Sequence, residues 1–204
     1  MLTEQFIIRQ LQAAYQPGRM LYMDGPVAGL YKEAELKCAA VLVPLVNWQD
    51  EWHLIFTRRT DTVEHHKGQV SFPGGGCELG ETSPETTALR EAQEEIGLNP
   101  QEVRLLGRMT DSVIITRFRV TPVVGVLPWP YPLRPEPAEV ARIFTIPLLW
   151  LADRQNWEVQ PFTPPGAQRT FQVVSYHPYD SEILWGATAR MTQDLLTLLG
   201  LLGT

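Results

Sequence analysis

Cysteine is scarce in this chain of 204 residues, which contains only Cys38 and Cys77. Two cysteines are too few for a disulfide framework or a zinc site, so we expect two reduced, buried thiols. Long apolar runs are also missing, since no stretch approaches the roughly 18 residues that a membrane helix needs. The first residues contain an early acid and too short an apolar segment for a signal peptide, so we expect a cytoplasmic protein without a membrane partner.

Positive charge is in short supply as well. The chain has 17 Lys and Arg against 23 Asp and Glu, a formal net charge of −6. This balance excludes a broad basic surface, and we expect no nucleic-acid partner. A small anionic substrate is not excluded, because it requires only a metal ion and a few local cations. The length and the 44% hydrophobic content fit one globular domain over residues 1–204.

One stretch, from a glycine-rich loop to a helix, carries most of the chemical information. After Gly74, Gly75 and Gly76, a good N-cap residue, Ser83, precedes a proline suited to the first helical position. Gly97 is a typical helix stop. The sequence therefore predicts a helix over residues 84–96.

This predicted helix carries Glu91, Glu94 and Glu95 at positions i, i+3 and i+4, which places three carboxylates on one face. An acidic, solvated outer face is one interpretation. The other is a site for a hard divalent cation such as Mg²⁺, completed by substrate phosphates. The second is favoured because the carboxylates flank, rather than oppose, an apolar stripe formed by Ala88, Leu89, Ala92 and Ile96.

The same stretch resembles the signature of the Nudix hydrolases, which cleave a nucleoside diphosphate linked to another group. One departure is that eight residues, rather than seven, separate Glu81 from Arg90. The resemblance implies an α/β/α sandwich with a mixed β-sheet, and the alternation of predicted strands and helices indicates the same α/β class. The residues that carry the resemblance are Gly75, Glu81, Arg90, Glu91, Ala92, Glu94, Glu95, Gly97 and Leu98.

Residues 57–76 resemble the upstream motif of one Nudix branch, the coenzyme A diphosphatases, and residues 184–190 resemble the start of its C-terminal helix. Glu64 departs from the motif, where a basic residue is usual. This resemblance implies hydrolysis of coenzyme A to 4′-phosphopantetheine and adenosine 3′,5′-bisphosphate with Mg²⁺ or Mn²⁺. The matching positions are Arg59, Thr60, Val63, His66, Gly68, Gln69, Val70 and residues 72–75.

The expected roles follow from these matches. Glu91, Glu94 and Glu95 would hold the metal ion and act in catalysis, and Glu139 is a candidate general base or, alternatively, a cap of the segment after it. Gly74 and Gly75 would let the backbone approach the substrate.

Arg90 is expected to orient a carboxylate, while Glu78 and Glu81 are either outer ligands or exposed turn acids. The cations expected near the substrate are Arg58, Arg59, His65, His66 and Lys67, of which Arg59, His66 and Lys67 are the principal candidates.

Two other functions stay open. The substrate could be ADP-ribose, NADH or a dinucleotide polyphosphate, which the Glu64 departure favours. In a different class, the chain could be a nucleotide-binding regulator that has lost catalysis.

The rest of the chain predicts a frame for this stretch. Helices are expected at residues 3–15, 147–152 and 183–202, and residues 1–36 otherwise form an irregular extension. The last helix is leucine-rich, so it belongs to the core or to a homodimer interface. The proline-rich segment 128–137 is a loop that either shapes the substrate site or only connects two strands. Strands are expected at residues 38–46 (with Pro44 near its end or at an edge), 52–58, 103–109, 118–127 and 141–146, and as a hairpin at 157–163 and 170–176.

Overall fold

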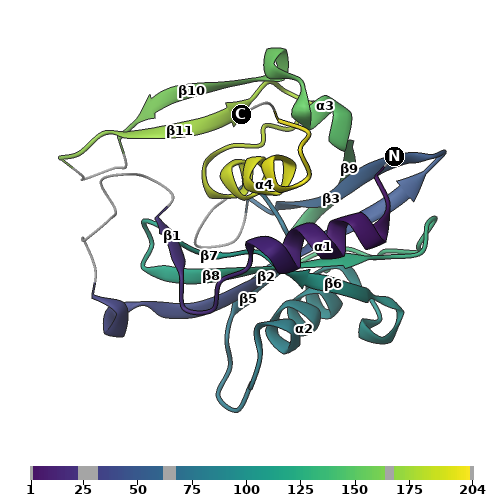
Figure 1. Ribbon diagram of the computed structural model, residues 1–204, viewed down its shortest axis with the longest axis horizontal. Coiled ribbons are helices and arrows are strands. Elements are labelled where there is room, and N and C mark those ends of the chain that lie inside the picture. Colours follow the sequence, from purple (N-terminus) through teal and green to yellow (C-terminus); the bar gives the residue numbers. More distant parts are fainter. Residues whose placement is uncertain (1, 23–31, 62–67, 164–167, 203–204) are drawn as a thin grey trace.

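A nine-stranded mixed sheet forms the centre of the fold (Figure 1). The computed structural model describes residues 2–22, 32–61, 68–163 and 168–202. Its helices are α1 (Glu4–Ala14), α2 (Pro84–Ile96), α3 (Leu148–Ala152) and α4 (Gly186–Leu198). The sheet comprises β1 (Met20–Tyr22), β2 (Lys37–Trp48), β3 (Glu51–Arg59), β4 (Val70–Ser71), β5 (Gly74–Gly76), β6 (Arg104–Arg108), β7 (Asp111–Val113), β8 (Phe118–Val126) and β9 (Val140–Pro147); β10 (Trp157–Phe162) and β11 (Phe171–Tyr176) form a separate antiparallel hairpin.

The layers confirm the predicted α/β/α sandwich. β2 runs parallel to β8 and antiparallel to β3 and β5, and β9 runs antiparallel to β3. Figure 1 shows α2 on one side of the sheet, α1 and α4 on the other, and the β10–β11 hairpin beyond α4. The hairpin therefore adds a layer outside the three that the sequence predicts.

β2 is the strand on which both cores depend. Because side chains alternate along a strand, its odd-numbered residues Ala39, Val43 and Leu45 join a core that includes Leu11 of α1 and Leu195 of α4. Its residues Ala40, Leu42 and Val46 join the core beneath α2. The apolar run at 38–46 is thus buried on both faces, as predicted.

Pro44 is not near the end or the edge of this strand; the expectation is wrong on this point. Pro44 lies inside β2, opposite Gly125 of the parallel strand β8. Its nitrogen points to the same side as that of Leu42, which donates to Pro73 O. On that side β2 changes partners: its pairing with β5 ends at Val41, and its pairing with β3 begins at Leu45. Pro44 lies between these two pairings, so its missing N–H removes no ladder hydrogen bond and a proline is tolerated.

α4 begins three residues later than predicted. Residues 183–185 follow the edge of β11 instead. Tyr176 N donates a hydrogen bond to Leu184 O (2.8 Å), and Trp185 forms an isolated antiparallel β-bridge with Ser175. Leu195 and Leu199 are buried in the core. The homodimer stays a prediction. None of the described helices combines the length and the apolar character that crossing a membrane would require.

The two cysteines form a disulfide, so the expectation of reduced, buried thiols is wrong. Cys38 is exposed and Cys77 is half-buried. The β2–β5 register pairs Ala39 with Gly76, which brings Cys38 opposite Cys77 with a Cα–Cα distance of 5.4 Å. That separation is the usual one for a disulfide. Strand register, which the sequence did not reveal, therefore decides the state of the cysteines.

Reducing this disulfide should lower the free energy of unfolding by about 2–4 kcal/mol, because the crosslink joins residues 39 positions apart and restricts the unfolded chain. The measurement is urea unfolding with and without dithiothreitol. The double substitution Cys38→Ser, Cys77→Ser is the control and should not respond to the reductant. An unchanged midpoint for the native sequence on reduction would contradict the prediction.

Candidate active site

α2 has the bounds that its sequence predicts. Ser83 Oγ accepts a hydrogen bond from Thr86 N (3.3 Å), Pro84 occupies the first turn, and Gly97 ends the helix in the left-handed conformation at φ 66°. The buried side includes Ala88, Ala92 and Ile96. This packing fixes the rotation of α2 and therefore the direction of its carboxylates.

Glu95 is the most deeply buried of these carboxylates, with only 3% of the residue exposed. One carboxylate oxygen accepts from Gly74 N (3.2 Å), and the other lies 3.3 Å from Arg59 Nη1. Burial raises the pKa of Glu95 to about 7, although the Arg59 charge opposes the shift. The negative charges of Glu91 and Glu139 raise this pKa further.

Glu91 points into the same region, and the loop before α2 closes around it. Burial raises its pKa, while Arg90, at 2.9 Å, opposes that shift. A Cβ atom on residue 75 would lie 2.5 Å from the Glu91 carboxylate, and one on residue 74 would lie 2.5 Å from Ala40 O. Only glycine fits at Gly74 and Gly75 without displacing these groups.

Glu94 differs from its two neighbours on α2. Its side chain is 59% exposed and forms an i, i+4 ion pair with Arg90 (2.9 Å). The three carboxylates that the helix spacing places on one face are therefore not equivalent. Glu91 and Glu95 face inward, whereas Glu94 lies at the rim.

Arg90 joins the turn before α2 to the carboxylates on it, as the expected orienting role requires. Its Nε donates to Glu81 Oε1 (2.8 Å) and its Nη2 to Gly76 O (3.0 Å). Glu81 is not an exposed turn acid: its side chain is 10% exposed, and its Oε2 also accepts from Thr87 Oγ1 (2.6 Å). The hydrogen bonds from Arg90 and Thr87 lower the pKa of Glu81 to about 2.

Glu139 lies beside the buried carboxylates although it is distant in sequence. Its Oε2 is 3.7 Å from Arg59 Nη2, so Arg59 is shared between Glu139 and Glu95. The turn that carries Glu139 is fixed at both ends, because Glu136 N donates to Glu95 O and Thr60 N donates to Glu139 O, each at 2.9 Å. The structure thus brings the candidate base to the candidate metal ligands.

The expected cluster of substrate-binding cations is brought together only in part. Arg58 lies next to Arg59 in β3, so its side chain points to the opposite face of the sheet, where it pairs with Glu182 (3.5 Å) and Asp61 (3.3 Å). The expectation that it joins the cluster is wrong. The remaining members, His65, His66 and Lys67, lie outside the described residues.

Negative charge dominates the assembled site. Two guanidinium groups, those of Arg59 and Arg90, lie within 4 Å of six carboxylates, which leaves an excess of four negative charges when all are ionised. Among the described residues, no group of three or more Asp, Glu, His or Cys side chains is arranged so that it could hold a metal ion as it stands. The donors nevertheless fit a hard divalent cation, because they are oxygens whose negative charge is not compensated by the two guanidinium groups. The six carboxylates are Glu78, Glu81, Glu91, Glu94, Glu95 and Glu139.

Comparisons with known proteins agree with this geometry. Residues 36–165 match the NUDIX domain model. A protein described as an uncharacterized Nudix hydrolase NudL from Photorhabdus laumondii is 36% identical over 157 residues, covering 77% of this chain and 82% of that protein. The protein of the same description from Salmonella dublin is 33% identical over 170 residues, covering 83% and 86%.

A solved MutT/nudix family protein from Enterococcus faecalis shares the fold, with a TM-score of 0.50 and 12% identity, covering 98% of this chain and 81% of that one. The family match, the two relatives and the acidic site lead to one assignment. The chain belongs to the Nudix hydrolases, enzymes that act on phosphoric anhydrides.

Proposed function

We propose that this Nudix hydrolase cleaves the diphosphate of coenzyme A or its derivatives, which yields 4′-phosphopantetheine and adenosine 3′,5′-bisphosphate. The observation that carries the proposal is the group of six carboxylates around Arg59 and Arg90. The resemblance of residues 57–76 and 184–190 to the coenzyme A diphosphatases supports the choice of substrate.

Nudix hydrolases generally use divalent metal ions such as Mg²⁺ or Mn²⁺. Glu91 and Glu95, with Glu94 at the rim, are the residues proposed to hold this ion here. When bound, the ion supplies charge neutralisation at the diphosphate and a lower pKa for a water molecule. Burial raises the pKa of both Glu91 and Glu95, and the charges of Arg90 and Arg59 do not offset this shift, so an added cation beside the two carboxylates would be favourable.

The chain's own residues then have separate tasks. Glu139, half exposed beside Arg59, is proposed to accept the proton of the attacking water. Arg59 is proposed to bind a substrate phosphate in addition to Glu95 and Glu139, since its guanidinium has five N–H donors. The missing side chains of Gly74 and Gly75 make room for Ala40 O and the Glu91 carboxylate, which keeps Glu91 close to the loop proposed to lie beside the diphosphate. Arg90, held by Glu81, keeps Glu91 in place.

The cations proposed for the 3′-phosphate of coenzyme A are His66 and Lys67. Hydrolysis of ADP-ribose, NADH or a dinucleotide polyphosphate is the alternative that the Glu64 departure favours. A catalytically inactive regulator is less consistent with the site, because Glu95 raises the cost of folding at neutral pH and simple nucleotide binding gains nothing from it. The cytoplasmic location also stays a prediction.

A substrate panel tests this function. With Mg²⁺ or Mn²⁺, we expect coenzyme A to be hydrolysed faster than ADP-ribose, NADH and diadenosine polyphosphates. Dephospho-coenzyme A should have a kcat/KM roughly 10- to 150-fold lower than coenzyme A, because charge-assisted hydrogen bonds to the 3′-phosphate are lost.

The variants Lys67→Ala and His66→Ala should lose activity on coenzyme A and keep it on the dephospho form. Equal kcat/KM for the two substrates in the wild type would contradict the proposed recognition, and a preference for ADP-ribose or NADH would contradict the proposed substrate.

The raised pKa of Glu95 predicts how stability depends on pH. The carboxyl has a pKa of about 7 in the folded protein and 4.5 as its ordinary value, so the folded state holds a proton that the unfolded state has released. This contribution to stability is complete below the ordinary pKa and is lost as the pH rises through about 7. In EDTA, the wild type should lose up to about 3 kcal/mol more than Glu95→Gln between about pH 5 and 8 in urea unfolding. Parallel pH profiles for the two proteins would argue against the shift.

A further inference from the structure

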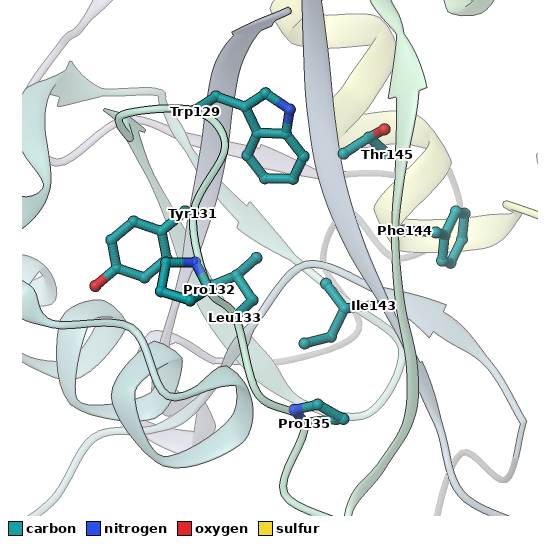
Figure 2. A pocket seen from close by; sticks show the side chains of 8 residues that line it. All are labelled: Trp129, Tyr131, Pro132, Leu133, Pro135, Ile143, Phe144 and Thr145. Atoms are coloured by element: carbon teal, nitrogen blue, oxygen red, sulfur yellow. The ribbon is translucent and has the colours of Figure 1, made fainter.

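An apolar groove lies on the α2 side of the sheet, between the proline-rich loop and β9 (Figure 2). It has a volume of about 340 Å³. Figure 2 shows Trp129 at one end and Pro135 at the other, with Leu133 on the loop side and Ile143 and Thr145 on β9. Tyr131, Pro132 and Phe144 complete the lining. The site described above does not include any of these residues.

The lining of the groove carries no formal charge and few available polar groups. None of its eight residues, all in the described part of the chain, is Asp, Glu, Lys, Arg or His. The Tyr131 hydroxyl is already engaged, since it donates to Glu102 and accepts from Asn99 N (3.1 Å). Among the lining side chains, Trp129 Nε1 and Thr145 Oγ1 are left to pair with a ligand, which is too few for the donors and acceptors of a nucleobase, whereas a hydrocarbon chain needs no such partner.

One end of the groove adjoins the carboxylates. Around Pro135, the loop is tied to the end of α2 twice: Arg134 N donates to Ile96 O and Glu136 N donates to Glu95 O, each at 2.9 Å. On the other side, Ile143 pairs with Thr57 of β3. Thr57 is two residues from Arg59, so the two side chains share a face of the sheet. The groove and the carboxylates therefore occupy one continuous face.

We propose that this groove binds the acyl chain of an acyl-coenzyme A substrate. This inference rests on the proposed function, because the diphosphate must lie at the site of the carboxylates, beside Arg59, for the rest of the substrate to reach the groove. The pantetheine arm would leave the diphosphate near Pro135 and carry the acyl chain toward Trp129. The loop at 128–137 then shapes the substrate site rather than only connecting strands.

The proposal predicts a preference for longer acyl chains. Each methylene buried in an apolar site is worth roughly a fourfold gain in affinity. Hexanoyl-coenzyme A should therefore have a kcat/KM at least about tenfold higher than that of acetyl-coenzyme A, even when only part of the chain is buried. The same ratio should appear in dissociation constants measured by calorimetry in EDTA, where no turnover occurs.

Two variants change the groove in opposite ways. Trp129→Ala removes one end of it, and Thr145→Leu fills part of it without removing a packed side chain. We expect both to reduce the hexanoyl-to-acetyl ratio to about 1–2. Trp48→Ala is the matched control, because Trp48 is 47% exposed at the tip of the β2–β3 hairpin and lies outside the groove. It should keep the wild-type ratio, and thermal melting checks that each variant is folded.

The outcomes separate the two proposals. A chain-length preference that both groove variants abolish and Trp48→Ala retains supports the groove. Hydrolysis of coenzyme A with no chain-length preference in the wild type, or with a preference that survives in a folded Thr145→Leu variant, overturns the groove and leaves the proposed function intact. A chain-length preference in binding without hydrolysis of any coenzyme A thioester overturns the proposed function alone.

Discussion

Uncompensated negative charge around two arginines is the constraint on which the rest of this structure depends. Glu95 is buried where the ionised form is costly, and its only nearby described cation, Arg59, is shared with Glu139. Glu91 shares Arg90 with three other acids. Such an arrangement lowers the stability of the protein at neutral pH. A divalent cation would reduce the excess negative charge and would also offset the charge of a bound diphosphate.

The scaffold keeps these charges in place through contacts that serve two purposes. Gly74 pairs with β2 through its backbone and also donates to Glu95, so sheet register and carboxylate position are coupled. The Cys38–Cys77 disulfide closes the same pair of strands at its end, one residue beyond Gly76. On the far side of α2, the turn at 136–139 holds the helix end and presents Glu139. The site is therefore fixed from the sheet, the loop and the turn at once.

Local signals were sufficient to predict much of this protein. Ser83, Pro84 and Gly97 set the bounds of α2, and the apolar run at 38–46 predicted a strand buried on both faces. The β10–β11 hairpin is also confirmed, although residues 164–167, between its strands, fall outside the described residues. The sequence left two interpretations of Glu139, a general base near the metal site or a cap of the following segment. The structure places it next to the carboxylates, and its catalytic role stays a prediction.

The features that could not be predicted are those that depend on strand register and on tertiary contacts. The short strands β1, β4, β5 and β7 have two or three residues, too few for a periodic pattern. The disulfide required the β2–β5 register. The sequence left Glu81 as either an outer ligand or an exposed turn acid, because nothing local showed that Arg90 and Thr87 would enclose it. Alternation in β3 could have shown that Arg58 and Arg59 point to opposite faces.

The turnover of Glu91→Gln and Glu95→Gln, at saturating Mg²⁺ or Mn²⁺, tests the central claim most directly. Glutamine keeps the size of the side chain and removes its charge, so the fold should survive while kcat falls at least ~100-fold. Glu158→Gln, on the exposed hairpin strand β10, is the matched control and should turn over like the wild type. Wild-type turnover in both glutamine variants of the cluster would show that the buried carboxylates are structural and contradict this account of the active site.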